Sequence, residues 1–273
     1  MTINNASRRN AYDPEMRRQM AEYLDELAED DDIKVVVLRG EGGVFSTGAD
    51  MGNAYAWYGP PGEKENGNGK SRRPSQRRRL TVDRKTFQFY HDYMGYPKVT
   101  VAEVRGFALG GGFELALMSD ISVVASDAIV GMPATRFLGP ALGGLHMFFH
   151  RLGPMLARRL LLTGDTPRAA ELEKYGIFTE VVEDDQVAGR ADWWAQKIAR
   201  MPADGIVIAK EAFRLVEQMQ AFQGEEASSY MLHAYGTNLQ FDEDEFNFVK
   251  TRAEYGTKRA FELRDAHFHV PEP

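Results

Sequence analysis

Two glycine-containing segments hold the residues best suited to chemistry. They are residues 45–50 (FSTGAD) and residues 106–115 (GFALGGGFEL), and each follows an apolar run that predicts a buried strand. Glycines after a strand let the backbone turn sharply and leave its N–H groups open to a ligand. If the two turns face one another, they can direct two N–H donors at a single oxygen. That arrangement is what an oxyanion hole requires.

Spacing alone leaves other interpretations of these glycines open. A triple glycine can serve close packing of the backbone, or it can cradle a phosphate at a helix N-terminus. The dinucleotide pattern G-x-G-x-x-G is not met, and the lysine of a P-loop is absent. A nucleoside triphosphate site is therefore excluded.

The segments around the two turns predict an α/β architecture. Short apolar runs rich in β-branched residues predict buried strands, and stretches with helical spacing predict the helices between them. The predicted strands are 33–38, 99–104 and 121–125, and the predicted helices are 14–27, 82–93 and 113–118. Residues 193–268 have an almost wholly helical pattern. The region 52–80 is rich in glycine, proline and arginine, which predicts a long surface loop.

Composition narrows the class of protein further. The chain has 273 residues, a formal charge of -7 and no cysteine. An acidic chain is a poor general binder of nucleic acid, and without cysteine there is no disulfide or thiolate metal site. No stretch approaches the roughly 18 apolar residues that a membrane helix needs. We expect a cytoplasmic protein with no nucleic-acid or membrane partner and no metal.

Further segments, in order along the chain, extend the pattern of the two turns. Together with those turns they resemble the signature segments of the crotonase (enoyl-CoA hydratase/isomerase) superfamily, over nearly the whole chain. The segments are Arg9-Asn10-Ala11, Ser119-Asp120-Ile121, Gly131-Met132-Pro133, Leu162-Thr163-Gly164-Asp165 and the tail 254–268.

The resemblance implies a fold and an assembly. The expected fold is a right-handed spiral of ββα units over residues 1–190, with the arginine-rich loop at about 52–80. Residues 191–273 would form a C-terminal helical trimerisation region, in a homotrimer or a dimer of trimers. The family's first strand normally precedes the segment that Thr2-Ile3-Asn4 resembles, so we expect an edge strand to be missing.

The resemblance also implies a substrate and a site. The substrate would be an acyl-CoA thioester, with coenzyme A as part of the substrate and no separate cofactor. The backbone N–H groups of Ala49 and Gly111 would form the oxyanion hole, and Glu114 would activate water. The family's coenzyme A contacts fall on Arg8, Arg9, Thr47, Ala49, Asp50 and Met51.

The chain departs from the family at the second catalytic glutamate. Enoyl-CoA hydratases of the family use two, and the second is expected after Gly131-Met132-Pro133, where this chain has Ala134. The family's C-terminal lysine is replaced by Leu263, although Arg264 follows it. Three functions stay open: a hydratase-like lyase, a carbon–carbon bond hydrolase or isomerase that uses a pocket histidine, and a non-catalytic acyl-CoA binding protein.

Histidines, arginines and aromatics near the motifs are further candidates. His146 and His150 lie four residues apart, so they would share one face of a helix, and His146 is the candidate acid or base. Thr135 and Arg136 flank Ala134 and are candidates to bind a polar group of the substrate. Tyr55, Trp57, Tyr58, Phe107, Phe113 and Phe137 would line an acyl pocket or pack in the core, and Arg72, Arg73, Arg77, Arg78 and Arg79 would meet phosphates or face solvent.

Overall fold

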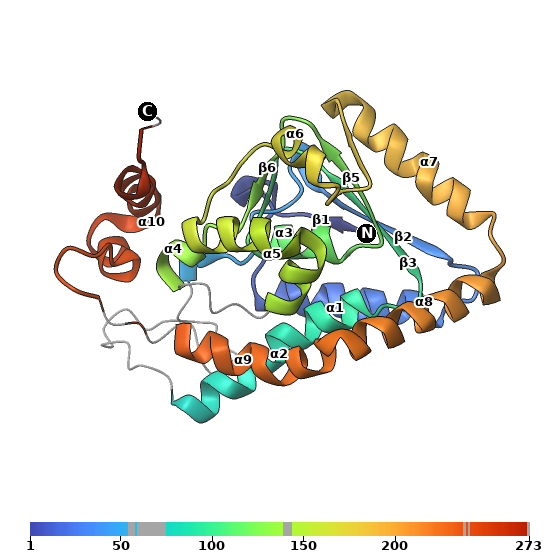
Figure 1. Cartoon of the computed structure of the whole chain (residues 1–273), viewed down its shortest axis with the longest axis horizontal. Coiled ribbons are helices and arrows are strands. Elements are labelled where there is room, and N and C mark those ends of the chain that lie inside the picture. Colours follow the sequence, from blue (N-terminus) through green and yellow to red (C-terminus); the bar gives the residue numbers. More distant parts are fainter. Residues whose placement is uncertain (54–57, 59–74, 139–143, 237–238, 240, 272–273) are drawn as a thin grey trace.

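A parallel β-sheet lies at the centre of the computed structural model, which describes residues 1–53, 58, 75–138, 144–236, 239 and 241–271. Helices surround this sheet (Figure 1). The sheet order is β1-β2-β3-β5-β7, and β4 pairs with β6 in a second, two-stranded parallel sheet. The strands are β1 (Thr2–Ile3), β2 (Val35–Gly40), β3 (Val99–Val104), β4 (Phe107–Leu109), β5 (Ile121–Ala125), β6 (Ile129–Gly131) and β7 (Glu180–Val182).

The central strands form because both of their faces are covered. Val101, Val104, Val123 and Val124 have no exposed surface, which suits β-branched residues in a buried parallel sheet. The register joins Val101 to Ile121 and continues to Val104 opposite Val124. Strands β3 and β5 therefore have the bounds that the sequence predicted.

Successive units of two strands and a helix repeat along the chain. Strands β3 and β4 lead into α3 (Gly111–Met118), and β5 and β6 lead into α4 (Thr135–Leu138) and α5 (Leu145–Thr163). Because β3 pairs with β5 and β4 pairs with β6, each unit stacks on the next. The predicted α/β spiral of ββα units is confirmed.

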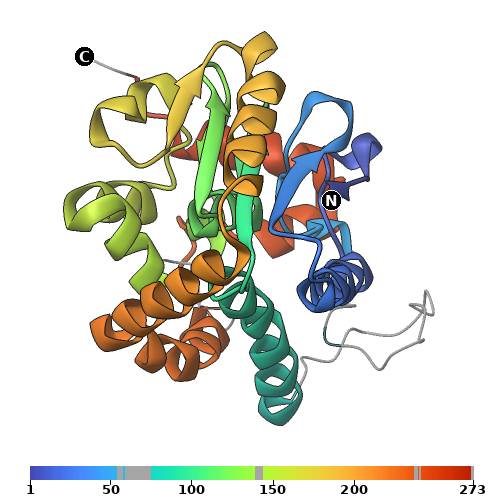
Figure 2. The same ribbon diagram turned by 90° about the vertical axis from the view of Figure 1, so that its right-hand side faces the viewer.

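The remaining helices cover the sheet and extend the fold. Helix α7 packs against β2, β3 and β5, and α9 packs against α2, as the turned view also shows (Figure 2). Helix α10 stands apart from the sheet, on the side of α4 (Figure 1). The α-helices not yet bounded are α1 (Pro14–Glu29), α2 (Gln76–Met94), α6 (Ala169–Leu172), α7 (Val187–Ala199), α8 (Ala203–Glu217), α9 (Gln223–Gly236) and α10 (Phe248–Phe268), with short 3-10 or π helices at Ala6–Arg8, Glu41–Gly43, Met51–Asn53, Glu173–Tyr175, Asp184–Gln186 and Gln218–Phe222.

The predicted domain boundary does not coincide with the end of an element. The predicted domain boundary at residue 190 falls inside α7, a helix that packs on the central sheet. Thr2–Ile3 forms the edge strand β1, which pairs in parallel with Arg39 and Gly40. None of the helices in the described ranges is long and apolar enough to span a membrane.

The predicted loop at 52–80 ends earlier than its composition suggested. Helix α2 begins at Gln76, because the Ser75 side chain accepts a hydrogen bond from the N–H of Arg78. Arg77, Arg78 and Arg79 are therefore helical, and Arg79 is buried. The prediction of a loop at these positions is wrong, because the arginine-rich composition was interpreted as a loop and the helix N-cap at Ser75 was not recognised. Residues 54–57 and 59–74, with Tyr55, Trp57, Arg72 and Arg73, lie outside the described residues.

Candidate active site

The two glycine turns predicted to face one another are in direct contact. Gly48 has φ +78°, and a Cβ added to it would lie 2.6 Å from the backbone nitrogen of Gly111. The backbones are joined by hydrogen bonds from Ser46 N–H to Phe107 (2.9 Å) and from Leu109 N–H to Ser46 (3.0 Å). Only glycine at position 48 allows both the left-handed backbone and this close approach.

The amides of Ala49 and Gly111 are at the junction of these turns. Among the hydrogen bonds of the described part of the chain, none is donated by either N–H. Gly110, with φ +56° and ψ -127°, breaks the strand so that α3 begins at Gly111. The positive end of α3 therefore lies directly after β4, with the amide of Gly111 as its first donor.

The start of the chain lies along the first turn. Thr47 N–H donates to Arg9 O (3.1 Å), Tyr12 N–H to Gly48 O (2.9 Å) and Asp50 N–H to Tyr12 O (2.9 Å). These bonds explain how two segments that are distant in the sequence contribute to one site. The N-terminal arginines are placed beside the turn that carries the amide of Ala49.

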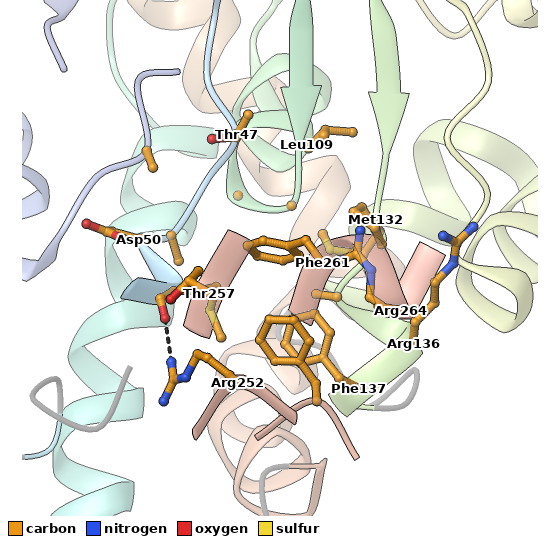
Figure 3. Close-up of a pocket in the computed structure, with 18 of the residues that line it drawn as sticks. Thr47, Asp50, Leu109, Met132, Arg136, Phe137, Arg252, Thr257, Phe261 and Arg264 are labelled. Atoms are coloured by element: carbon orange, nitrogen blue, oxygen red, sulfur yellow. Dashed lines mark hydrogen bonds between the residues drawn. The ribbon is translucent and has the colours of Figure 1, made fainter. Parts of the chain in front are cut away.

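A cavity of about 1660 Å³ opens between these turns and α10. Its wall includes Gly111, Glu114 and Ala134. All six residues predicted to contact coenzyme A also line it: Arg8, Arg9, Thr47, Ala49, Asp50 and Met51. Figure 3 shows Thr47, Asp50 and Leu109 on one side of this space and the α10 side chains on the other.

Charged groups mark the wall where the chain begins. Arg8 forms an ion pair with Asp50 at 2.7 Å, and the Arg8 side chain is 58% exposed. The Arg9 guanidinium lies over the Phe107 ring, 5.0 Å from its centroid. Both cations remain accessible at the edge of the cavity, where a pyrophosphate would find charge-assisted donors.

Helix α10 closes the opposite wall. Arg252 donates a hydrogen bond to the carbonyl of Met51 (dashed line in Figure 3). Phe137 stacks on Phe248 with ring centroids 5.0 Å apart. Arg264, beside the position of the absent family lysine, is buried, lines the cavity and pairs with Asp265 at 2.6 Å. The C-terminal segment thus supplies part of the cavity of its own chain.

Glu114 is a buried carboxyl group in the first turn of α3. Glu114 is 6% exposed, and its own backbone N–H donates a hydrogen bond to the carbonyl oxygen of Gly110 (3.1 Å). Burial, followed by the nearby carboxylate of Glu225, raises the pKa of Glu114 to about 8. Burial disfavours the charged form, and a like charge adds to that effect. A group with such a pKa can both take up and release a proton near neutral pH.

Two buried tyrosine hydroxyls lie beside the second turn. Tyr12 and Tyr90 are hydrogen-bonded to each other through their hydroxyl groups. A Cβ added to Gly111 would lie 2.1 Å from the Tyr12 oxygen and 2.2 Å from the Tyr90 oxygen. Burial raises the pKa of both phenols, so both stay neutral and can donate. Sequence reasoning missed them, although Tyr12 directly follows the recognised Arg9-Asn10-Ala11 segment.

The position of the absent glutamate is occupied by a methyl group. Ala134 lines the cavity and is partly buried. Beside it, the Thr135 hydroxyl donates to Met132 O at 3.1 Å, and Arg136 donates to Thr163 O at 3.2 Å. Both side chains that flank Ala134 (Thr135 and Arg136) are therefore hydrogen-bonded to backbone carbonyls of the protein, although Arg136 also lines the cavity.

His146 and His150 share a face of α5, as their spacing predicted. Their rings stack with centroids 5.8 Å apart. Within the described ranges, neither is among the residues that line the cavity. Burial lowers the pKa of each imidazole, so each is neutral over a wider pH range. The structure therefore does not bring His146 to the cavity that holds Glu114.

The predicted aromatics divide between cavity and core. Phe107, Phe137 and Tyr58 line the cavity, whereas Phe113 is fully buried in the core. The Tyr58 hydroxyl donates to Asp83 at 2.8 Å, and Asp83 lies 3.1 Å from His233. This part of the cavity wall is polar.

The chain is similar to known proteins over nearly its whole length. Residues 1–259 match the model of the enoyl-CoA hydratase/isomerase family. A probable enoyl-CoA hydratase of Mycobacterium bovis is 29% identical over 95% of this chain and 94% of its own length. A 1,2-epoxyphenylacetyl-CoA isomerase of Escherichia coli is 28% identical, over 80% and 78% respectively. The crystal structure of an enoyl-CoA hydratase/isomerase from Xanthobacter autotrophicus Py2 superposes with a TM-score of 0.82 at 26% identity, over 98% and 94% of the two chains.

Proposed function

This chain belongs to the enoyl-CoA hydratase/isomerase family, and from that premise we propose that it adds water to a 2-enoyl-CoA thioester with Glu114 as acid and base. The observation that carries the proposal is the buried carboxyl group of Glu114, one helical turn from the amide of Gly111 and in the same cavity. The cavity also holds every residue that the family resemblance assigned to coenzyme A.

The N–H groups of Ala49 and Gly111 would receive the thioester oxygen. As a nucleophile adds to the β-carbon, electrons move onto this oxygen, and two fixed donors stabilise the enolate that forms. The amide of Gly111 has the positive end of α3 behind it, which favours the same charge. This stabilisation needs no side chain, so it is unaffected by the replacement at position 134.

Glu114 would carry the proton in both directions. In its ionised form it takes a proton from water while the oxygen bonds to the β-carbon and the enolate forms. The protonated carboxyl group then gives that proton to the α-carbon, the enolate electrons return to form the new C–H bond, and Glu114 is ionised again. The net change is addition of one water molecule. A pKa of about 8 suits both half-steps, because the two protonation states are close in free energy.

The test is turnover of a panel of 2-enoyl-CoA esters, followed by loss of the conjugated thioester absorbance. We expect a rate that rises with pH up to about 8, since the base must be ionised. Ala134→Glu is expected to increase the rate by roughly tenfold by restoring a second acid–base group. If no ester in the panel turns over while ligand still binds, the chain is a binding protein or acts by a different reaction.

A histidine-based carbon–carbon bond hydrolase is the competing reaction. It requires an imidazole in the cavity. The stacked pair of His146 and His150 lies elsewhere, whereas His233 and His269 line the cavity. His146→Ala and His233→Ala are therefore the discriminating variants. Full retention of turnover is expected for the hydratase, and loss of turnover in a folded variant would favour the hydrolase.

Removal of the N-terminal cations is expected to weaken binding without slowing the reaction. Arg8 and Arg9 are exposed, line the cavity and have no part in the proposed proton transfer. The double change Arg8→Ala/Arg9→Ala should therefore raise KM about tenfold and leave kcat nearly constant. Steady-state kinetics on the best ester measures both. Arg18→Ala is the matched control, because Arg18 is exposed and pairs with Glu15 and Glu22 on α1. Equal KM in the double variant and the control would exclude these arginines from binding.

A further inference from the structure

A second buried carboxyl group lies close to Glu114, on a helix that the family motifs do not include. Glu225 of α9 is 5% exposed. Its Oε1 atom accepts a hydrogen bond from the N–H of His146 in the first turn of α5. Its Oε2 atom is buried with no hydrogen-bond partner among the described residues. A buried carboxylate oxygen without a hydrogen-bond donor destabilises the fold, so its presence calls for an explanation.

The first turn of α5 brings the two carboxyl groups together. Gly144 caps this helix, and a Cβ added there would lie 3.1 Å from Oε1 of Glu114. Two residues later, the amide of His146 holds Glu225. Glu225 therefore acts on Glu114 as a like charge across the start of α5. Glu225 is not among the described residues that line the cavity, so it does not contact a ligand there.

We propose that Glu225 is a positioning residue of the active site, which holds the α5 N-terminus in place and uses its charge to keep a proton on Glu114. The proposal rests on the acid–base role of Glu114 given above. Two carboxyl groups close together resist simultaneous ionisation, so the pair retains one proton to a higher pH than either alone.

The directions of the pKa shifts agree with this geometry. Burial raises the pKa of Glu225 to about 7, although the amides of His146 and Met147 oppose the shift. The charge on Glu225 is, after burial, the second cause that raises the pKa of Glu114 to about 8. The charge on Glu225 is therefore present when Glu114 loses its proton.

The elements packed around Glu114 carry other charged and titratable groups. Asp83 of α2 lies 3.1 Å from His233 of α9, and Glu217 of α8 lies 3.5 Å from Arg151 of α5. The neutral groups are the imidazoles of His146 and His150 and the phenols of Tyr12 and Tyr90. Arg17, which interacts with both phenols, is a buried cation of α1. Glu225 is the one group that acts on Glu114 as a neighbouring charge among the described residues.

The test measures the ionisation of Glu114 directly, without substrate. A pH titration of carboxyl ¹³C chemical shifts in the full chain gives the midpoint of Glu114, whose signal is assigned by its loss in Glu114→Gln. In Glu225→Gln the amide oxygen can still accept from His146, but the charge is gone. The Glu114 midpoint is expected to fall by roughly half to one pH unit. Glu225→Asp, which keeps the charge, should return most of the shift.

Glu217→Gln is the matched control, because this half-buried carboxylate also neighbours α5 but does not act on Glu114. The Glu114 midpoint in this control should equal that of the wild type.

An unchanged midpoint in folded Glu225→Gln overturns the proposal and leaves Glu225 as a cap for α5. If Glu225→Gln does not fold, the wild-type titration decides: a second inflection of the Glu114 signal where Glu225 ionises supports the pair, and a single inflection overturns it. These outcomes do not depend on turnover, so failure of the proposed hydration remains a separate result.

Discussion

Glu114→Gln is expected to lower kcat about a thousandfold. It is also expected to become more stable relative to the wild type as the pH rises from acidic to neutral. The loss of activity follows because glutamine can neither accept nor donate the transferred proton, and a positioned acid–base group contributes about 10²–10⁴ in rate. The gain in stability has a different cause, which is the burial of the carboxyl group.

The pH dependence of this gain follows from proton linkage. The carboxyl group has an ordinary pKa of 4.5 in the unfolded chain and a pKa of about 8 in the fold. Between these values the folded state holds a proton that the unfolded state has lost, so stability falls as pH rises. The expected slope is about 1.4 kcal/mol per pH unit, or roughly 3 kcal/mol between pH 5 and pH 7. The variant lacks this contribution.

Urea unfolding of both proteins at several pH values measures the difference. Glu173→Gln is the control, because this glutamate is exposed and should leave the slope unchanged. Parallel stability curves for Glu114→Gln and the wild type would show that Glu114 ionises normally in the fold. Activity that survives Glu114→Gln would remove this residue from the proposed reaction.

Gly111→Ala is expected to abolish most of the activity and to destabilise the fold. The added Cβ would lie 2.1 Å and 2.2 Å from two buried hydroxyl oxygens, those of Tyr12 and Tyr90. Both rings are enclosed by the core, so the backbone of Gly111 must move instead. Overpacking of this kind costs about 1–3 kcal/mol, and displacement of one oxyanion donor costs about 10²–10³ in kcat.

A rescue experiment separates the two effects. Tyr12→Phe and Tyr90→Phe remove the two nearest atoms and leave the ring carbon Cζ of residue 12 at 3.2 Å, so the triple variant should recover part of the stability lost in Gly111→Ala. Gly189→Ala is the matched control, since a Cβ at that helical glycine meets nothing within 4 Å and should be neutral or slightly stabilising. Thermal unfolding and kcat are the measurements. Wild-type kcat in Gly111→Ala would exclude its amide from the reaction.

Local sequence patterns predicted those strands and helices whose formation depends mainly on residues close by in the chain. Strands β3 and β5 were predicted with the observed bounds because short runs of β-branched residues are typical of parallel strands that are covered on both faces. The start of α2 was missed, since the Ser75 cap lies at the end of an arginine-rich stretch. Strand β4 was missed because its three residues lie within the glycine-rich turn, and its partners, β6 and Ser46, are distant in the sequence.

The sequence by itself determined the two glycine turns, the carboxyl group of Glu114 and the absence of an acid at position 134, because each is a property of residue type at a position in a motif. Only the tertiary structure decided what surrounds them. It placed Glu225 at the start of α5, the hydroxyls of Tyr12 and Tyr90 against Gly111, and the side chains of α10 across the cavity. These groups come from segments far apart in the chain. Their effect on one another depends on distance and burial, which no local pattern encodes.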